Sequence, residues 1–237
     1  MPRIRHDFIL MLCMSVSIFG VFFIVILAFN PPIIHENFFW RKPLVGSIFS
    51  LICVSGISAA LFPKQCSQIS HFQRVDTNST SHLIHTNSHH PNCEEFSAHV
   101  IRISNRTLCA ACTGLLFGAV VALIGTVFCF FGGWHTEDAS FSVVFIGLVG
   151  IILGFLQFKF RSFIRLILNA VFVLGAFLIL VGIDELTQSL FIDLFLVAFI
   201  VFWILTRVQF SQWDHWRICS SCKSPCEVLG MRKKWAG

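Results

Sequence analysis

Cysteines and histidines outside the apolar segments are the residues whose types and spacing point to chemistry. A first group consists of His90, Cys93, Cys109 and Cys112, in which fifteen residues separate two close pairs. Two close pairs at this separation are typical of zinc sites, and one nitrogen with three sulfurs suits tetrahedral zinc. We prefer His90 as the fourth ligand because two residues separate it from Cys93, as in the second pair. The alternative fourth ligands are His85, His89 and His99.

A second group lies near the end of the chain and has the pattern H-x3-C-x2-C-x3-C. Its members are His215, Cys219, Cys222 and Cys226. Pro225 favours a turn before the last cysteine, which helps a compact run of residues to close around one ion. In a further arrangement, this tail supplies ligands to a single site shared with the three cysteines of the first group.

Other roles for these thiols remain open. The pairs are also compatible with structural or redox-active thiols, including a dithiol. Thr113 and Lys223 follow the two C-x2-C pairs, so neither has the haem-attachment pattern C-x-x-C-H. Neither run has the ferredoxin spacing, although an iron–sulfur cluster is retained as the alternative to zinc. Cys13, Cys53 and Cys129 lie in apolar runs, where cysteine behaves as a small hydrophobic residue.

The composition defines the kind of protein that must position these groups. Of 237 residues, 56% are hydrophobic and only 12% are charged, whereas a soluble domain has about 25% charged residues. The mean hydropathy is +0.80. Such a chain cannot cover a soluble globule with polar groups, and it fits neither a disordered chain nor a small disulfide scaffold. We therefore expect an all-α, polytopic membrane protein.

Six apolar runs are long enough to cross a bilayer, which takes about 20 residues in a helix. They are Phe8–Phe29, Leu44–Phe62, Thr113–Phe131, Phe141–Phe158, Phe163–Ile183 and Leu190–Thr206. The fourth run is the weakest because glycines interrupt it. The predicted organisation is two spans in 1–62, a polar Cys/His-rich loop in 63–112, four spans in 113–206 and a basic Cys-rich tail in 207–237.

Two local patterns predict finer structure. In the second half of the polar loop, apolar residues alternate with polar ones up to a turn at Asn105, which indicates a short hairpin or an interfacial helix. Two Gly-x3-Gly faces begin at Gly114 and Gly150, and the second run is rich in small residues. Such faces let helices approach closely, so we expect the second, third and fourth spans to form the tight centre.

The basic residues predict the orientation. With six spans, all 17 Lys and Arg residues except Arg41 and Lys42 fall on the side that the two termini share. By the positive-inside rule, both termini and the long loop face the cytoplasm of a cell membrane. Glycosylation acceptor patterns at Asn78 and Asn105 favour the inverted topology. In a reducing cytoplasm, paired cysteines hold metal more often than they form disulfides.

Three acidic residues lie together near the opposite edge. Asp184 and Glu185 are in the predicted turn between the last two spans, and Asp193 is near the start of the sixth. We expect a small acidic cluster that reaches water at the membrane edge. The sharper interpretation is a site for cations or protons, because acids inside spans often serve a function.

The stretch His90–Gly118 resembles an uncharacterised prokaryotic family of small membrane proteins. That family has a His/Cys/Glu segment followed by C-A-R-C-T-G at the start of a span. The matching residues here are His90, Cys93, Glu94, Cys109, Cys112, Thr113, Gly114 and Gly118. Ala111 replaces the arginine of the motif, so any role of that arginine does not carry over. The resemblance supports the first ligand group and implies no reaction.

The lead interpretation is a membrane protein with a cytoplasmic zinc site that has a structural role. It would act as a binding or accessory component, with the lipid bilayer and other membrane-protein subunits as partners and without nucleic acid. The first alternative is a membrane redox protein with an iron–sulfur cluster or a dithiol, and the second is a cation transporter. The sequence contains no recognisable catalytic motif and assigns no catalytic residue.

Overall fold

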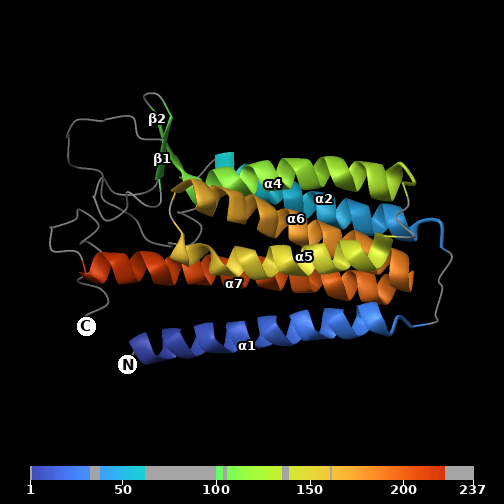
Figure 1. Ribbon diagram of the computed structural model, residues 1–237, viewed down its shortest axis with the longest axis horizontal. Helices are drawn as coiled ribbons and strands as arrows, with labels where there is room; N and C mark the ends of the chain where they lie inside the picture. Colours follow the sequence, from blue (N-terminus) through green and yellow to red (C-terminus); the bar gives the residue numbers. More distant parts are fainter. Residues whose placement is uncertain are drawn as a thin grey trace.

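The chain is a multi-pass, helical membrane protein, seen here in a computed structural model (Figure 1). The structure describes residues 2–32, 38–61, 100–103, 106–134, 139–160 and 162–221. Five helices in these ranges are long and apolar enough to cross a bilayer, and a sixth apolar helix is shorter. The main helices are α1 (Pro2–Phe29), α2 (Arg41–Leu61), α4 (Ala110–Thr126), α5 (Ser140–Phe155), α6 (Ser162–Thr187) and α7 (Leu190–Ser221). The predicted all-α polytopic fold is confirmed.

Two of the six helices reach their full length through a different kind of turn. The π-helical segment η2 (Val127–Phe131) extends α4, and the 3-10 segment η4 (Leu156–Lys159) extends α5. The 16 residues of α5 give about 24 Å, and one 3-10 turn adds about 8 Å. Together they match a hydrocarbon layer of about 30 Å, so the weakest of the predicted spans has the length that a span needs.

The helix α6 forms the centre of the bundle. It packs along α4 and α5 and also contacts α7, while α2 packs against α4. The prediction that the second, third and fourth spans form the centre is therefore wrong in one respect. The fifth span, α6, is the common partner of the glycine-bearing helices. Small residues indicate where a neighbouring helix packs closely, but they do not indicate which helix that neighbour is.

The predicted glycine faces are real points of close packing. A Cβ atom at Gly147 would lie 2.7 Å from the carbonyl oxygen of Gly175 on α6, and one at Gly150 would lie 2.9 Å from that of Val171. On α4, a Cβ at Gly118 would lie 2.8 Å from the carbonyl oxygen of Ala170. Side chains at these positions would separate the backbones, so glycine is what lets α4 and α5 contact α6.

A short antiparallel hairpin leads into α4. Strand β1 (Val100–Ile103) pairs with β2 (Arg106–Cys109), and Val100 lies opposite Cys109. The hairpin is one of the two forms predicted for this stretch. It lies at the end of the bundle where α1 begins and α7 ends (Figure 1). Cys109, the last residue of β2, therefore lies at this end of the helical bundle.

Candidate functional site

Two buried polar clusters lie near opposite ends of the helix α6. One includes Asp184 in the last turn of α6, and the other includes Arg165 in its first turn. Asp184 follows Arg165 by nineteen positions, which is about 28 Å along a helix. This distance is close to the thickness of the hydrocarbon layer, so the two clusters mark the two edges of the apolar part of the bundle.

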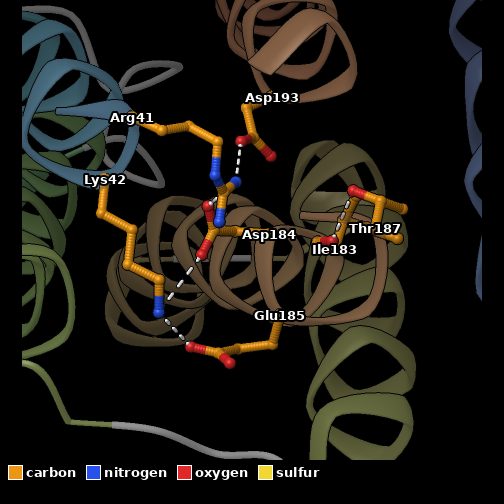
Figure 2. A network of polar contacts seen from close by, with 7 residues as sticks. All are labelled: Arg41, Lys42, Ile183, Asp184, Glu185, Thr187 and Asp193. Carbon is orange, nitrogen blue, oxygen red and sulfur yellow. Dashed lines mark hydrogen bonds and ion pairs between the residues drawn. The ribbon is translucent and has the colours of Figure 1, made fainter. Parts of the chain in front are cut away.

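The first cluster consists of two basic and three acidic side chains and is called the acid–base cluster here. Its members are Arg41, Lys42, Asp184, Glu185 and Asp193. Nη1 of Arg41 donates to Oδ1 of Asp184 at 2.6 Å and to Oδ2 of Asp193 at 2.5 Å (Figure 2). Nζ of Lys42 lies 2.6 Å from Oε1 of Glu185 and 3.7 Å from Oδ2 of Asp184. These contacts join α2, α6 and α7.

A tight turn between α6 and α7 brings the two aspartates together. Only Gln188 and Ser189 separate these helices, and Gln188 adopts a positive φ of 47° that reverses the chain direction. The backbone amide of Asp193 donates to the carbonyl oxygen of Ser189 at 3.0 Å. The turn therefore brings Asp184, near the end of α6, close to Asp193, in the first turn of α7. Both side chains point toward Arg41.

The signs of the charges oppose the helix dipoles at two of these helix ends. Arg41 and Lys42 begin α2, where a helix favours negative charge, and Asp184 and Glu185 lie near the end of α6, where it favours positive charge. Each pair is locally unfavourable. The charges are stabilised instead by pairing with each other across the helices, which requires α2 and α6 to lie side by side at this end.

The acid–base cluster is largely withdrawn from solvent. Arg41 is 4% exposed, Asp184 is 2% exposed and Asp193 is fully buried. The side chain of Lys42 is 24% exposed and marks the side on which the cluster meets solvent. Oδ1 of Asp193 is buried and has no hydrogen-bond partner among the residues that the structure describes. In Figure 2 this oxygen points away from Arg41.

The second cluster surrounds two of the predicted ligands and is called the cysteine–arginine cluster. Its members are Cys109, Cys112, Arg165, Arg207 and Asp214. Cys109 is the N-cap residue of α4, where no side chain caps the helix within the described residues, and Cys112 lies in the first turn. Cys109 is buried and Cys112 is half-buried. The free backbone amides of such a turn and the helix dipole stabilise thiolates.

Gly114, which follows Thr113, lets the two thiols lie close to the interior of the bundle. A Cβ atom at Gly114 would lie 2.2 Å from the carbonyl oxygen of Leu166 and 2.7 Å from Cβ of Asn169. Glycine thus lets the beginning of α4 press against the first turns of α6. The hydroxyl of Thr113 donates to the carbonyl oxygen of Cys109 at 2.9 Å, which holds the backbone of the turn.

Arg207 is a buried cation within electrostatic range of the thiols. It is 5% exposed, and its guanidinium donates to Oε1 of Gln157 at 3.1 Å and lies 5.3 Å from the ring centre of Phe172. Both of these partners are uncharged. The guanidinium is also within electrostatic range of the Cys112 and Cys109 side chains. A thiolate at either cysteine would therefore face a buried positive charge.

A second guanidinium lies on the α6 side of the same cluster. Arg165 is 3% exposed and lies 3.3 Å from Oδ2 of Asp214, which is also buried. Arg217, whose side chain is 63% exposed, lies 3.6 Å from the other oxygen of Asp214. The amide of Asn169 donates to the carbonyl oxygen of Arg165. The Arg165–Asp214 pair joins the later part of α7 to the beginning of α6.

The structure places only part of the predicted metal ligands. Cys109 and Cys112 share the beginning of α4, and His215 and Cys219 lie on the final turns of α7. Within the described ranges, no three His, Cys, Asp or Glu side chains are grouped so that they could hold a metal ion. The other residues named as ligands, alternative ligands or motif positions lie outside the described residues: His85, His89, His90, Cys93, Glu94, His99, Cys222 and Cys226.

The predicted acidic cluster is present, but the expectation that it reaches water is wrong for Asp193, which is fully buried because it pairs with Arg41 between the helices. The basic partners Arg41 and Lys42 are not predicted, although two adjacent cations at the edge of an apolar run are a signal for buried pairing. The sequence predicts that the sixth span ends at Thr206, which places Arg207 in the tail. In the structure α7 continues to Ser221, so Arg207 and Asp214 lie within the helix.

Arg41→Met tests whether the acid–base cluster holds the bundle together. The substitution leaves two buried carboxylates without their shared cation, so we expect a loss of about 3–5 kcal/mol in the free energy of unfolding. Arg217→Met is the matched control, since it removes an exposed partner and should cost at most about 1 kcal/mol. Unfolding in mixed micelles measures both values. Equal effects of the two substitutions would show that the cluster contributes little.

Comparisons with known proteins identify no relative of this chain. No family model, no curated protein and no solved structure matches it. The resemblance of His90–Gly118 to a membrane-protein family therefore stays a prediction. The function is therefore inferred from the buried charges, the thiols and the helix ends described above.

Proposed function

We propose that the protein binds a metal ion through Cys109 and Cys112 at the cytoplasmic face of a cell membrane. The ion is zinc, in a structural role, and the remaining ligands come from the first group (His90 and Cys93) or from the tail. The protein then acts as a binding or accessory component of a membrane complex. The cytoplasmic orientation rests on the distribution of basic residues.

The observation that carries this proposal is a buried guanidinium, that of Arg207, within electrostatic range of both thiols. A buried guanidinium with uncharged partners, 5% exposed, favours a nearby negative charge. Zinc binds cysteine as the thiolate, and a zinc ion with several thiolates carries a net negative charge. Arg207 and the beginning of α4 thus supply the electrostatic support that a zinc–thiolate site needs.

A dithiol redox function is the second candidate. Cys109 at the N-cap and Cys112 three residues later lie on the same helical turn. A C-x2-C pair at a helix N-terminus next to a cation is also the environment of reactive redox cysteines. Both candidate functions use Cys109 and Cys112. In the first the two thiolates bind a metal ion, and in the second they form and break a disulfide.

The double variant Cys109→Ser, Cys112→Ser tests the proposed site. We expect protein purified in mild detergent to contain stoichiometric zinc, and we expect this variant to lose it. The matched control is Cys13→Ser, Cys129→Ser, which removes two half-buried cysteines elsewhere and should keep the metal. Elemental analysis gives the metal content, and thiol titration gives the redox state. Unchanged zinc in the first variant contradicts the proposal, whereas metal-free protein with a reversible Cys109–Cys112 disulfide favours the redox candidate.

Arg207→Gln tests the electrostatic support of the thiols. Loss of a group that stabilises metal ligands typically costs about 10–100-fold in metal affinity, and we expect a weakening of this size. Arg207→Lys keeps the positive charge and should retain most of the affinity. Competition with a chelator, carried out on the folded fraction, measures the change, and Arg217→Gln serves as the exposed control. Equal affinity in Arg207→Gln and the wild type would remove Arg207 from the site.

A further inference from the structure

The acid–base cluster contains one carboxylate that lacks a counterion of its own. Asp184 has a cation near each oxygen, with Arg41 at 2.6 Å and Lys42 at 3.7 Å. In the part of the chain that the structure describes, the ion-pair partner of Asp193 is the same Nη1 of Arg41, which contacts Oδ2. Its other oxygen is buried and without a hydrogen-bond partner there. Two carboxylates therefore share one guanidinium.

The surplus negative charge is not balanced by the helices. The carboxylates of Asp184 and Asp193 both pair with the single guanidinium of Arg41. The beginning of α7 favours negative charge at Asp193, but a helix end is equivalent to only about half a charge. Asp193 is fully buried at the edge of an apolar bundle. A full unpaired negative charge is costly in such a place, so a positive charge must accompany it.

The two aspartates lie close enough to share that charge. Oδ1 of Asp184 and Oδ2 of Asp193 both contact Nη1 of Arg41, so the two carboxyl groups are neighbours around one nitrogen atom. Two carboxyl groups at such a separation do not both ionise readily, and a hydrogen bond between them requires a proton. We propose that Asp184 and Asp193 form a proton-binding pair that holds one proton, exchanged with water on the side of Lys42.

A proton fits this place better than a metal cation. Hard cations take about six or more oxygen ligands, and Oδ1 of Asp193 is the one buried carboxylate oxygen without a partner in the described residues. The charged groups that face the pair are Arg41 and Lys42 on α2 and Glu185 on α6. The site lies near the opposite end of α6 from the thiols, so it does not depend on the proposed metal binding.

Infrared spectroscopy of the full chain in lipid vesicles tests the proposal. A protonated carboxyl group absorbs separately from an ionised one, and we expect such a band at neutral pH in the wild type. The band should shift when the protein carries carboxyl-labelled [13C]aspartate, and it should move in heavy water because the proton exchanges. Absence of a protonated aspartyl band in the labelled wild type overturns the proposal without any variant.

Substitutions then assign the band. Asp193→Asn replaces a neutral acid by a neutral amide of the same shape, so we expect the band to disappear while the thermal unfolding midpoint stays close to that of the wild type. Asp184→Asn removes the ionised partner of Arg41 and Lys42 and should lower the midpoint. Glu185→Gln is the control that keeps the band. Persistence of the band in folded Asp193→Asn overturns the proposal, and so does a sodium-dependent rise in the midpoint that Asp193→Asn abolishes.

Discussion

A single guanidinium shared by carboxylates of two helices is the interaction on which the arrangement of the bundle depends. Arg41 begins α2 and contacts Asp184 of α6 and Asp193 of α7 within 2.6 Å. A buried ion pair contributes little when its partners are well matched, but breaking it is costly. The three helices must therefore turn these side chains toward one point. This requirement fixes the rotation of α2, α6 and α7 about their axes, which apolar packing in lipid leaves open.

The bundle is polarised along α6. At one end, two carboxylates share the guanidinium of Arg41, and at the other, Arg207 has uncharged partners and is within electrostatic range of two thiols. Each end thus favours a charge of a different sign: a positive charge at the aspartates, and a negative charge at Arg207. About 28 Å of apolar helix separates the ends, so each meets water on its own side of the membrane. Chemistry at one end need not involve the other.

Hydropathy predicts the six helices, and the alternation of apolar and polar residues indicates the hairpin. Both features depend on residues that are close together in the sequence. The glycines of the Gly-x3-Gly faces also lie at close contacts, yet the partner is α6, since a small residue does not identify its neighbour. Asp193 was found because an acid in an apolar run is costly wherever it lies. Arg41 and Arg207 were missed as partners because pairing depends on helix rotation and on where α7 ends. The predicted ligands His90, Cys93, Cys222 and Cys226 lie outside the described residues.

A double-mutant cycle on the free energy of unfolding tests the shared-cation constraint most directly. The cycle combines Arg41→Met with Asp184→Asn and is compared with Arg41→Met combined with Asp214→Asn, which alters the buried aspartate of the opposite end. Residues in one buried ion network couple by about 0.5–3 kcal/mol, whereas distant residues are additive. We expect coupling in the first cycle and additivity in the second. Additive effects of Arg41→Met and Asp184→Asn would contradict a bundle held by this guanidinium.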